Sequence, residues 1–102
     1  MIKATKNELK IISDILRKFV PCCEVRVFGS RYNGNAKKYS DLDLAIVSKD
    51  TSDSNVISDM KDAFEESDLP YRVDLLDWNT ISPEFKKVIE ESGFEVLQTP
   101  QC

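Results

Sequence analysis

One stretch decides the fold of this 102-residue chain: Glu24 to Val47, with the sequence EVRVFGSRYNGNAKKYSDLDLAIV. Polar and apolar side chains alternate over its first four residues, Phe28 follows them, and an apolar run interrupted by two acids ends the stretch. Alternation with β-branched residues is typical of strands, and Gly29-Ser30 after the first run indicates a tight turn. The stretch therefore predicts β-strands at 24–28 and 41–47, joined by a turn and a short helical segment.

The segments on either side supply further helices and strands. Thr5 and Glu8 have the spacing of a capping box, and apolar residues then recur at helical spacing until Pro21. Ser82-Pro83 is typical of a helix start. The remaining pattern predicts helices at 6–19, 55–67 and 83–91 and strands at 71–76 and 94–97. This order indicates an α/β (α+β) chain, in which helices pack on one small mixed sheet within a single domain, residues 1–102.

Charge and hydropathy exclude several classes of function. Lys and Arg number 14 against 18 Asp and Glu, which gives a net charge of −4. That sign disfavours binding to a phosphate backbone, so we expect no direct contact with nucleic acid. No apolar run approaches the length of a membrane span or a signal peptide. We therefore expect a cytoplasmic protein that does not enter a membrane.

The residues available for chemistry are restricted. The chain has no histidine, which removes every Ser/His or Cys/His nucleophile. Its cysteines are Cys22, Cys23 and Cys102, and the adjacent pair makes a poor disulfide, so we expect three ordinary thiols and no zinc site. Any catalysis must use carboxylates, lysines or a metal ion.

Three acids stand out in strand-like surroundings. Residues two apart on a strand share a face, so Asp41 and Asp43 should project together and repel one another. A divalent cation between them would explain the pair, although two acids on a solvent-facing sheet would also account for it. If the strand containing Asp74 lies alongside, a cluster of three carboxylates could hold two Mg²⁺ ions. Asp77, further along, is expected to be a loop or capping acid.

The Gly29-Ser30 turn is the second candidate feature. Glycine permits a sharp bend and a close approach to a ligand, and amides that open a helix attract an anion. The turn could therefore cradle phosphate, or it could simply connect two elements. It lacks the spacing of a Walker loop.

Taken together, these motifs resemble a known family. Gly29-Ser30, ten residues and then Asp41-Leu42-Asp43 resemble the G-S-x10-D-x-D signature of the DNA polymerase β-like nucleotidyltransferase superfamily. The fuller run from Phe28 to Leu44 is similar to its minimal nucleotidyltransferase branch, and the run VDLLD at 73–77 is similar to that branch's later acidic strand. The resemblance implies a polymerase β-like nucleotidyltransferase core.

The resemblance also implies a nucleotide site. Gly29 and Ser30 would hold the triphosphate of ATP. Arg31 stands where the branch carries a basic residue near the phosphates, although it could also be a surface residue that pairs with nearby acids.

The same resemblance implies a metal site. Asp41 and Asp43 would ligate Mg²⁺, with two ions expected. Asp74 would be the third carboxylate, which places or deprotonates the attacking hydroxyl.

The branch implies a partner protein as well. Its members pair with small helical toxins of the HEPN type, and characterised examples transfer AMP from ATP to a tyrosine of the toxin. We therefore expect a protein adenylyltransferase that acts as the antitoxin of such a pair. Two alternatives stay open: a non-catalytic nucleotide-binding module that neutralises its partner by binding, and transfer to a small molecule. The acidic helix at 55–67 could meet a basic partner surface or could simply face solvent.

Overall fold

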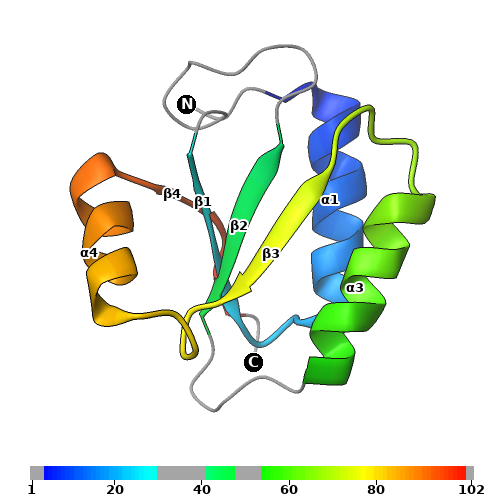
Figure 1. Cartoon of the computed structure of the whole chain (residues 1–102). Coiled ribbons are helices and arrows are strands. Elements are labelled where there is room, and N and C mark those ends of the chain that lie inside the picture. The colour runs from blue at the N-terminus through cyan, green and yellow to red at the C-terminus, as the bar shows by residue number, and fades with distance from the viewer. Residues whose placement is uncertain (1–3, 30–40, 48–53, 101–102) are drawn as a thin grey trace.

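The computed structural model describes residues 4–29, 41–47 and 54–100. In Figure 1 a twisted sheet lies between two helices on one side and a third helix on the other. The elements in chain order are α1 (Lys6–Phe19), β1 (Glu24–Phe28), β2 (Leu42–Val47), α3 (Ser54–Glu66), β3 (Val73–Asp77), α4 (Pro83–Ser92) and β4 (Glu95–Gln98). They agree with the expected elements to within two residues at either end. The short helical segment expected between β1 and β2 falls outside the described residues.

The four strands form one mixed sheet in the order β3-β2-β1-β4. β1 pairs antiparallel with both of its neighbours, β2 and β4. β2 and β3 run parallel, as a connection through a crossover helix allows, and here the helix is α3. The predicted fold class, helices on a small mixed sheet, is confirmed.

The main core lies between the sheet and the pair α1 and α3. Alternate residues of β1, β2 and β3 point to this side, and α1 and α3 each add one stripe of apolar residues. The buried side chains at the centre are Ile12, Leu16, Met60 and Phe64 from the helices and Val25, Val27, Leu42, Leu44, Ile46, Val73 and Leu75 from the strands. Because these positions alternate, the intervening strand residues must face the other side of the sheet.

The first turn of α1 is fixed by the predicted capping box. The Thr5 side chain accepts a hydrogen bond from the Glu8 backbone N–H at 3.1 Å, and Glu8 Oε1 accepts one from the Thr5 N–H at 3.1 Å. The same Oε1 also accepts a hydrogen bond from the Tyr71 hydroxyl at 3.1 Å. Glu8 therefore connects the start of α1 to the segment that leads into β3.

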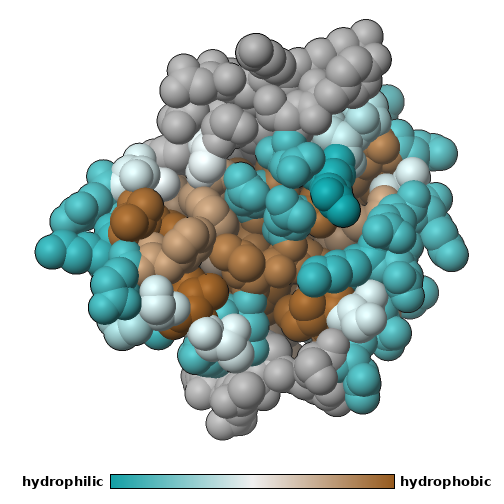
Figure 2. All heavy atoms as spheres, viewed as in Figure 1, coloured by the Kyte–Doolittle hydropathy of each residue, from teal (hydrophilic) through white to brown (hydrophobic). Residues whose placement is uncertain are grey.

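Helix α4 lies against the opposite face of the sheet. The Phe85 ring meets the Phe28 ring of β1 edge to face, with centroids 6.3 Å apart. Ile89 is buried, whereas Phe85, Val88 and Val96 are 41%, 55% and 42% exposed. Figure 2 shows hydrophobic residues gathered on this face toward α4 and hydrophilic residues above them, over β2 and β3.

The expectation of three ordinary thiols is wrong for Cys22, which is disulfide-bonded. Cys23 is free, so the bond does not join the adjacent pair, the geometry on which the expectation rested. Burial, and secondly the negative charge of Asp77, raise the pKa of the Cys23 thiol. Cys102 lies outside the described residues. Among the helices that the structure describes, none is long and apolar enough to cross a membrane.

Candidate active site

The parallel pairing of β2 and β3 brings two of the predicted acids together. Asp43 and Asp74 are partners in the register, so their side chains stand side by side on the same face, with strands about 4.8 Å apart. Leu42 and Leu44 point into the core on either side of Asp43, as the alternation requires. Asp41 comes directly before β2 and is exposed. The structure therefore places Asp74 on the same side of the sheet as Asp43.

The electrostatics of Asp43 show that the three carboxylates act on one another. Burial, and secondly the negative charges of Asp74 and Asp41, raise the pKa of Asp43 from 3.8 to about 6. Ionisation of a half-buried carboxyl group beside two negative charges costs free energy. A bound cation would remove that cost and hold all three groups ionised.

The Gly29 turn lies directly against Asp43. Gly29 follows the end of β1 with a φ of +78°, in the left-handed region that favours glycine. A Cβ at this position would collide with Asp43 Oδ2 and lie 3.3 Å from Asp43 Cγ. The bend and the carboxylate can therefore be this close only because residue 29 has no side chain. Ser30 and Arg31, the other predicted nucleotide-binding residues, lie outside the described residues.

The donor set suits a hard cation. It offers only carboxylate oxygens, the ligands that Mg²⁺ prefers, and no sulfur or imidazole. Within residues 4–29, 41–47 and 54–100, however, no three acidic or cysteine side chains already stand in an arrangement that could hold a metal ion. Asp43 and Asp74 share a face, and the charges of Asp74 and Asp41 repel that of Asp43, but the three carboxylates do not converge on one point. Their chemistry fits Mg²⁺, and its binding would have to bring their oxygens together.

An aromatic arrangement on the same face of the sheet was not predicted from the sequence. The Arg26 guanidinium lies between the rings of Trp78 and Phe94, 4.8 and 4.5 Å from their centroids. Arg26 Nε also donates to Glu24 Oε2 at 2.5 Å. Arg26 and Phe28 are two apart on β1, so the arrangement continues the row of side chains beside Asp43. The alternation in β1 was the available signal, because it places Arg26 on the face away from the core.

Asp77 is a turn acid, one of the two roles expected of it. It is the last residue of β3, and its Oδ1 accepts a hydrogen bond from the Asn79 N–H at 3.0 Å. It takes no part in the cluster formed by Asp41, Asp43 and Asp74.

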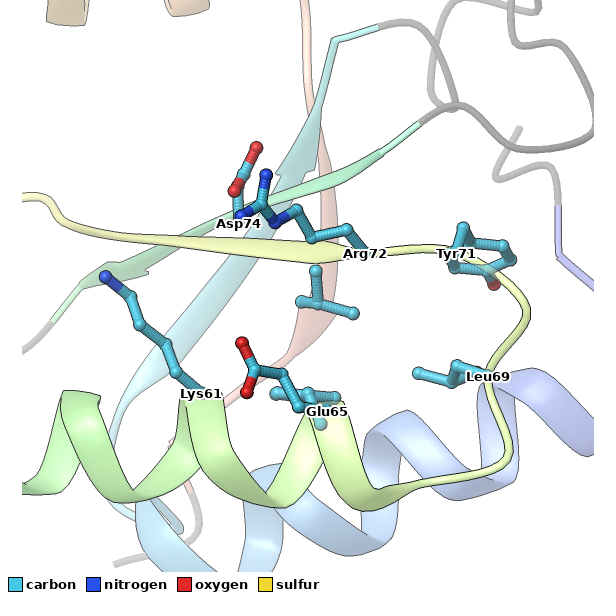
Figure 3. Close-up of a pocket in the computed structure, with 8 residues that line it drawn as sticks. Lys61, Glu65, Leu69, Tyr71, Arg72 and Asp74 are labelled. Atoms are coloured by element: carbon cyan, nitrogen blue, oxygen red, sulfur yellow. The ribbon is translucent and has the colours of Figure 1, made fainter.

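A groove borders the site on its outer side. It encloses about 320 Å³ between the second half of α3 and β3. In Figure 3, Lys61 and Glu65 extend from α3 toward β3, and Arg72 reaches along β3 to Asp74. The residues that line the groove are Lys61, Phe64, Glu65, Leu69, Tyr71, Arg72, Val73 and Asp74. One of the three acids is thus shared between the site and the groove.

The fold and these motifs define the class of the protein. Residues 10–101 match the family described as "Polymerase beta, Nucleotidyltransferase". The chain belongs to this family and is a nucleotidyltransferase.

One curated relative is similar to most of the chain. Over 85 residues the chain is 54% identical to a Haemophilus influenzae protein named "Probable protein adenylyltransferase MntA", covering 83% of this chain and 75% of the relative. The predicted membership of the nucleotidyltransferase superfamily is thus confirmed. The name of the relative contains the activity that the resemblance implied, protein adenylyltransferase.

Solved structures agree with the fold. A chain from the crystal structure of a toxin–antitoxin with AMP-PNP superposes with a TM-score of 0.74 at 26% identity, covering 91% of this chain and 74% of the other. A chain from the complex of a tri-AMPylated Shewanella oneidensis HEPN toxin with an MNT antitoxin gives a TM-score of 0.66 at 24% identity, over 91% and 71% of the two chains. Because the second chain is only 24% identical, that match shows the fold alone.

Proposed function

We propose that this chain transfers AMP from ATP to a hydroxyl group of a partner protein, and that the partner is a small helical HEPN-type toxin that the transfer neutralises. One observation carries the proposal: Asp43 stands level with Asp74 while the Gly29 turn lies against Asp43. The name of the H. influenzae relative and the AMP-PNP complex of a similar chain support the choice of reaction and nucleotide.

The site residues divide into two groups. Asp41, Asp43 and Asp74 would hold Mg²⁺, which when bound neutralises charge on the triphosphate and on the phosphoryl group in transfer. Gly29 lets the backbone bend close to the carboxylates, so the amides that follow can approach the phosphates. Ser30 and Arg31 keep their predicted roles at the triphosphate.

The transfer itself exchanges one phosphorus–oxygen bond for another. The acceptor hydroxyl oxygen bonds to the α-phosphorus of ATP, and the bond from that phosphorus to the oxygen bridging to the β-phosphate breaks. Pyrophosphate leaves with the electron pair of the broken bond. Asp74, at the outer edge of the cluster, orients the hydroxyl and takes its proton.

Label transfer tests this assignment. The chain is incubated with α-³²P-ATP, Mg²⁺ and the protein encoded in the adjacent reading frame, and the label on that protein is measured. In Asp43→Asn we expect labelling to fall by on the order of a thousandfold, since several kcal/mol of charge stabilisation would be lost. Asp62→Asn is the matched control, because Asp62 is exposed on α3 and away from the cluster. Retained labelling in Asp43→Asn contradicts the proposal.

The same assay separates the alternatives. A binding module would neutralise the partner without labelling it, and Asp43→Asn would neutralise it equally well. An enzyme that modifies small molecules would leave the protein unlabelled and label a low-molecular-weight hydroxyl compound instead.

A further inference from the structure

The outer edge of β3 has backbone groups that no strand of the described sheet uses. β3 is the terminal strand, next to β2 only. Arg72 C=O accepts a hydrogen bond from the Leu42 N–H at 2.9 Å, and the Trp78 N–H donates to Ile46 C=O at 3.0 Å. In a parallel pair, alternate residues face the neighbouring strand, so the even-numbered residues of β3 face β2. Val73 and Leu75 therefore present their N–H and C=O groups to the outside, whereas Asp77 C=O already accepts hydrogen bonds from the Thr80 N–H and hydroxyl, both at 3.0 Å.

This edge forms one wall of the groove that ends at Asp74. The opposite wall is α3, and the residues that line the groove include three apolar ones, Phe64, Leu69 and Val73. The volume of about 320 Å³ is sufficient for a large side chain with part of its backbone. The groove therefore combines the two requirements for strand addition: free main-chain groups and a pocket for an alternate side chain.

The charges around the groove favour a polypeptide over a polyanion. Lys61 and Glu65 extend toward it from α3, and Arg72 and Asp74 line it from β3, with the Asp74 carboxylate pointing away from α3. The formal charges of these four residues sum to zero. A nucleotide or nucleic acid would meet two carboxylates here, whereas a main chain of N–H and C=O groups meets donors and acceptors of both kinds.

We infer that the groove between α3 and the free edge of β3 binds an extended, hydroxyl-bearing segment of the acceptor protein, which adds to the sheet as a strand beside β3. The inference rests on the proposed function. Side chains level with one another on adjacent strands share a face and lie about 4.8 Å apart along the sheet. The residue of the added strand that is level with Asp74 therefore projects its hydroxyl beside that carboxylate, in the row that already contains Phe28, Asp43 and Asp74.

The same geometry sets the requirement on the acceptor sequence. Neighbouring residues of a strand point to opposite faces, so a residue next to the hydroxyl residue points down between β3 and α3. Its side chain enters the pocket over Phe64 and Val73. The acceptor segment should thus carry a hydroxyl residue followed or preceded by an apolar one.

Two adjacent glutamates on α3 give a matched test. Glu65 lines the groove and Glu66 does not, and both are exposed. In Glu65→Trp the added ring fills the groove, and we expect kcat/KM for the acceptor protein to fall about tenfold through its KM, the effect of losing one good contact. Glu66→Trp should stay within about twofold of wild type, since surface changes outside the contact have small effects. The dissociation constant for AMP-PNP should be the same in all three proteins.

Hydrogen exchange in the wild-type chain tests the strand directly. Saturation with the acceptor protein should slow exchange of the Val73 and Leu75 amides by more than about tenfold, because they gain hydrogen-bond partners. The Asp74 and Leu76 amides face β2 and serve as controls. Equal acceptor kinetics in Glu65→Trp and wild type, or unchanged exchange at Val73 and Leu75, would overturn the inference. Absence of any label on the acceptor in wild type would instead overturn the proposed function.

Discussion

Replacing Asp43 by asparagine should make the folded chain more stable at neutral pH, although it removes a carboxylate from the proposed site. Burial, and secondly the negative charges of Asp74 and Asp41, raise the pKa of Asp43 to about 6 in the folded state, against 3.8 for an aspartate in water. A carboxyl group with a raised pKa destabilises the fold wherever it must be ionised. The penalty is therefore fully present above about pH 6 and disappears below about pH 3.8. Asparagine has a similar shape, carries no charge and avoids the penalty.

The size of the effect follows from the shift. A rise from 3.8 to about 6 corresponds to about 3 kcal/mol without screening. Asp43 is only half-buried, so solvent screening reduces this to about 1 kcal/mol. In a domain of about 100 residues, 1 kcal/mol changes Tm by about 4–8 °C.

Thermal unfolding followed by circular dichroism measures the difference. In buffer with EDTA at pH 8, Asp43→Asn should melt about 4–8 °C above wild type, and the gap should close at pH 4. Mg²⁺ should raise the Tm of wild type more than that of the variant, since a ligand stabilises only the state that binds it. Asp62→Asn should match wild type throughout. A variant that melts below wild type at pH 8, or a gap that persists at pH 4, would refute the assignment of an electrostatic penalty to Asp43.

Two further substitutions test other parts of the site. Gly29→Ala should lower the free energy of unfolding in urea by more than about 2 kcal/mol, because the positive φ costs about 1–2 kcal/mol and the added Cβ collides with the Asp43 carboxylate; a loss below about 1 kcal/mol would contradict this. Arg26→Ala should cost about 1–2 kcal/mol and change the fluorescence of Trp78, the only tryptophan, because a cation over its ring is lost. Unaltered emission would show that the contact does not persist in solution.

Local signals in the sequence predicted the elements well. The Thr5–Glu8 capping box and the alternation around Asp43 act over a few residues, and the structure has both as expected. The Gly-Ser turn predicted a sharp bend, and the structure has Gly29 with a φ of +78° against Asp43. The single domain over 1–102 and the roles of all the predicted site residues stay predictions.

Contacts between distant segments could not be predicted in the same way. Asp43 and Asp74 meet only if β3 lies parallel beside β2, and the sequence pattern does not determine which strands are neighbours. The groove needs both α3 and the position of β3 at the sheet edge. The stacking of Arg26 joins β1 to two residues near the other end of the chain, Trp78 and Phe94. In each case the alternation of polar and apolar residues predicts which face a side chain is on. Its neighbours from other segments depend on the order of the strands in the sheet.

The hydrogen bond from Tyr71 to Glu8 joins residues 63 positions apart and has a mechanical consequence. The Glu8 carboxylate connects the first turn of α1 to the segment before β3, the strand that carries Asp74. Loss of the first helical turn would therefore remove a hydrogen bond that holds the start of β3 against α1.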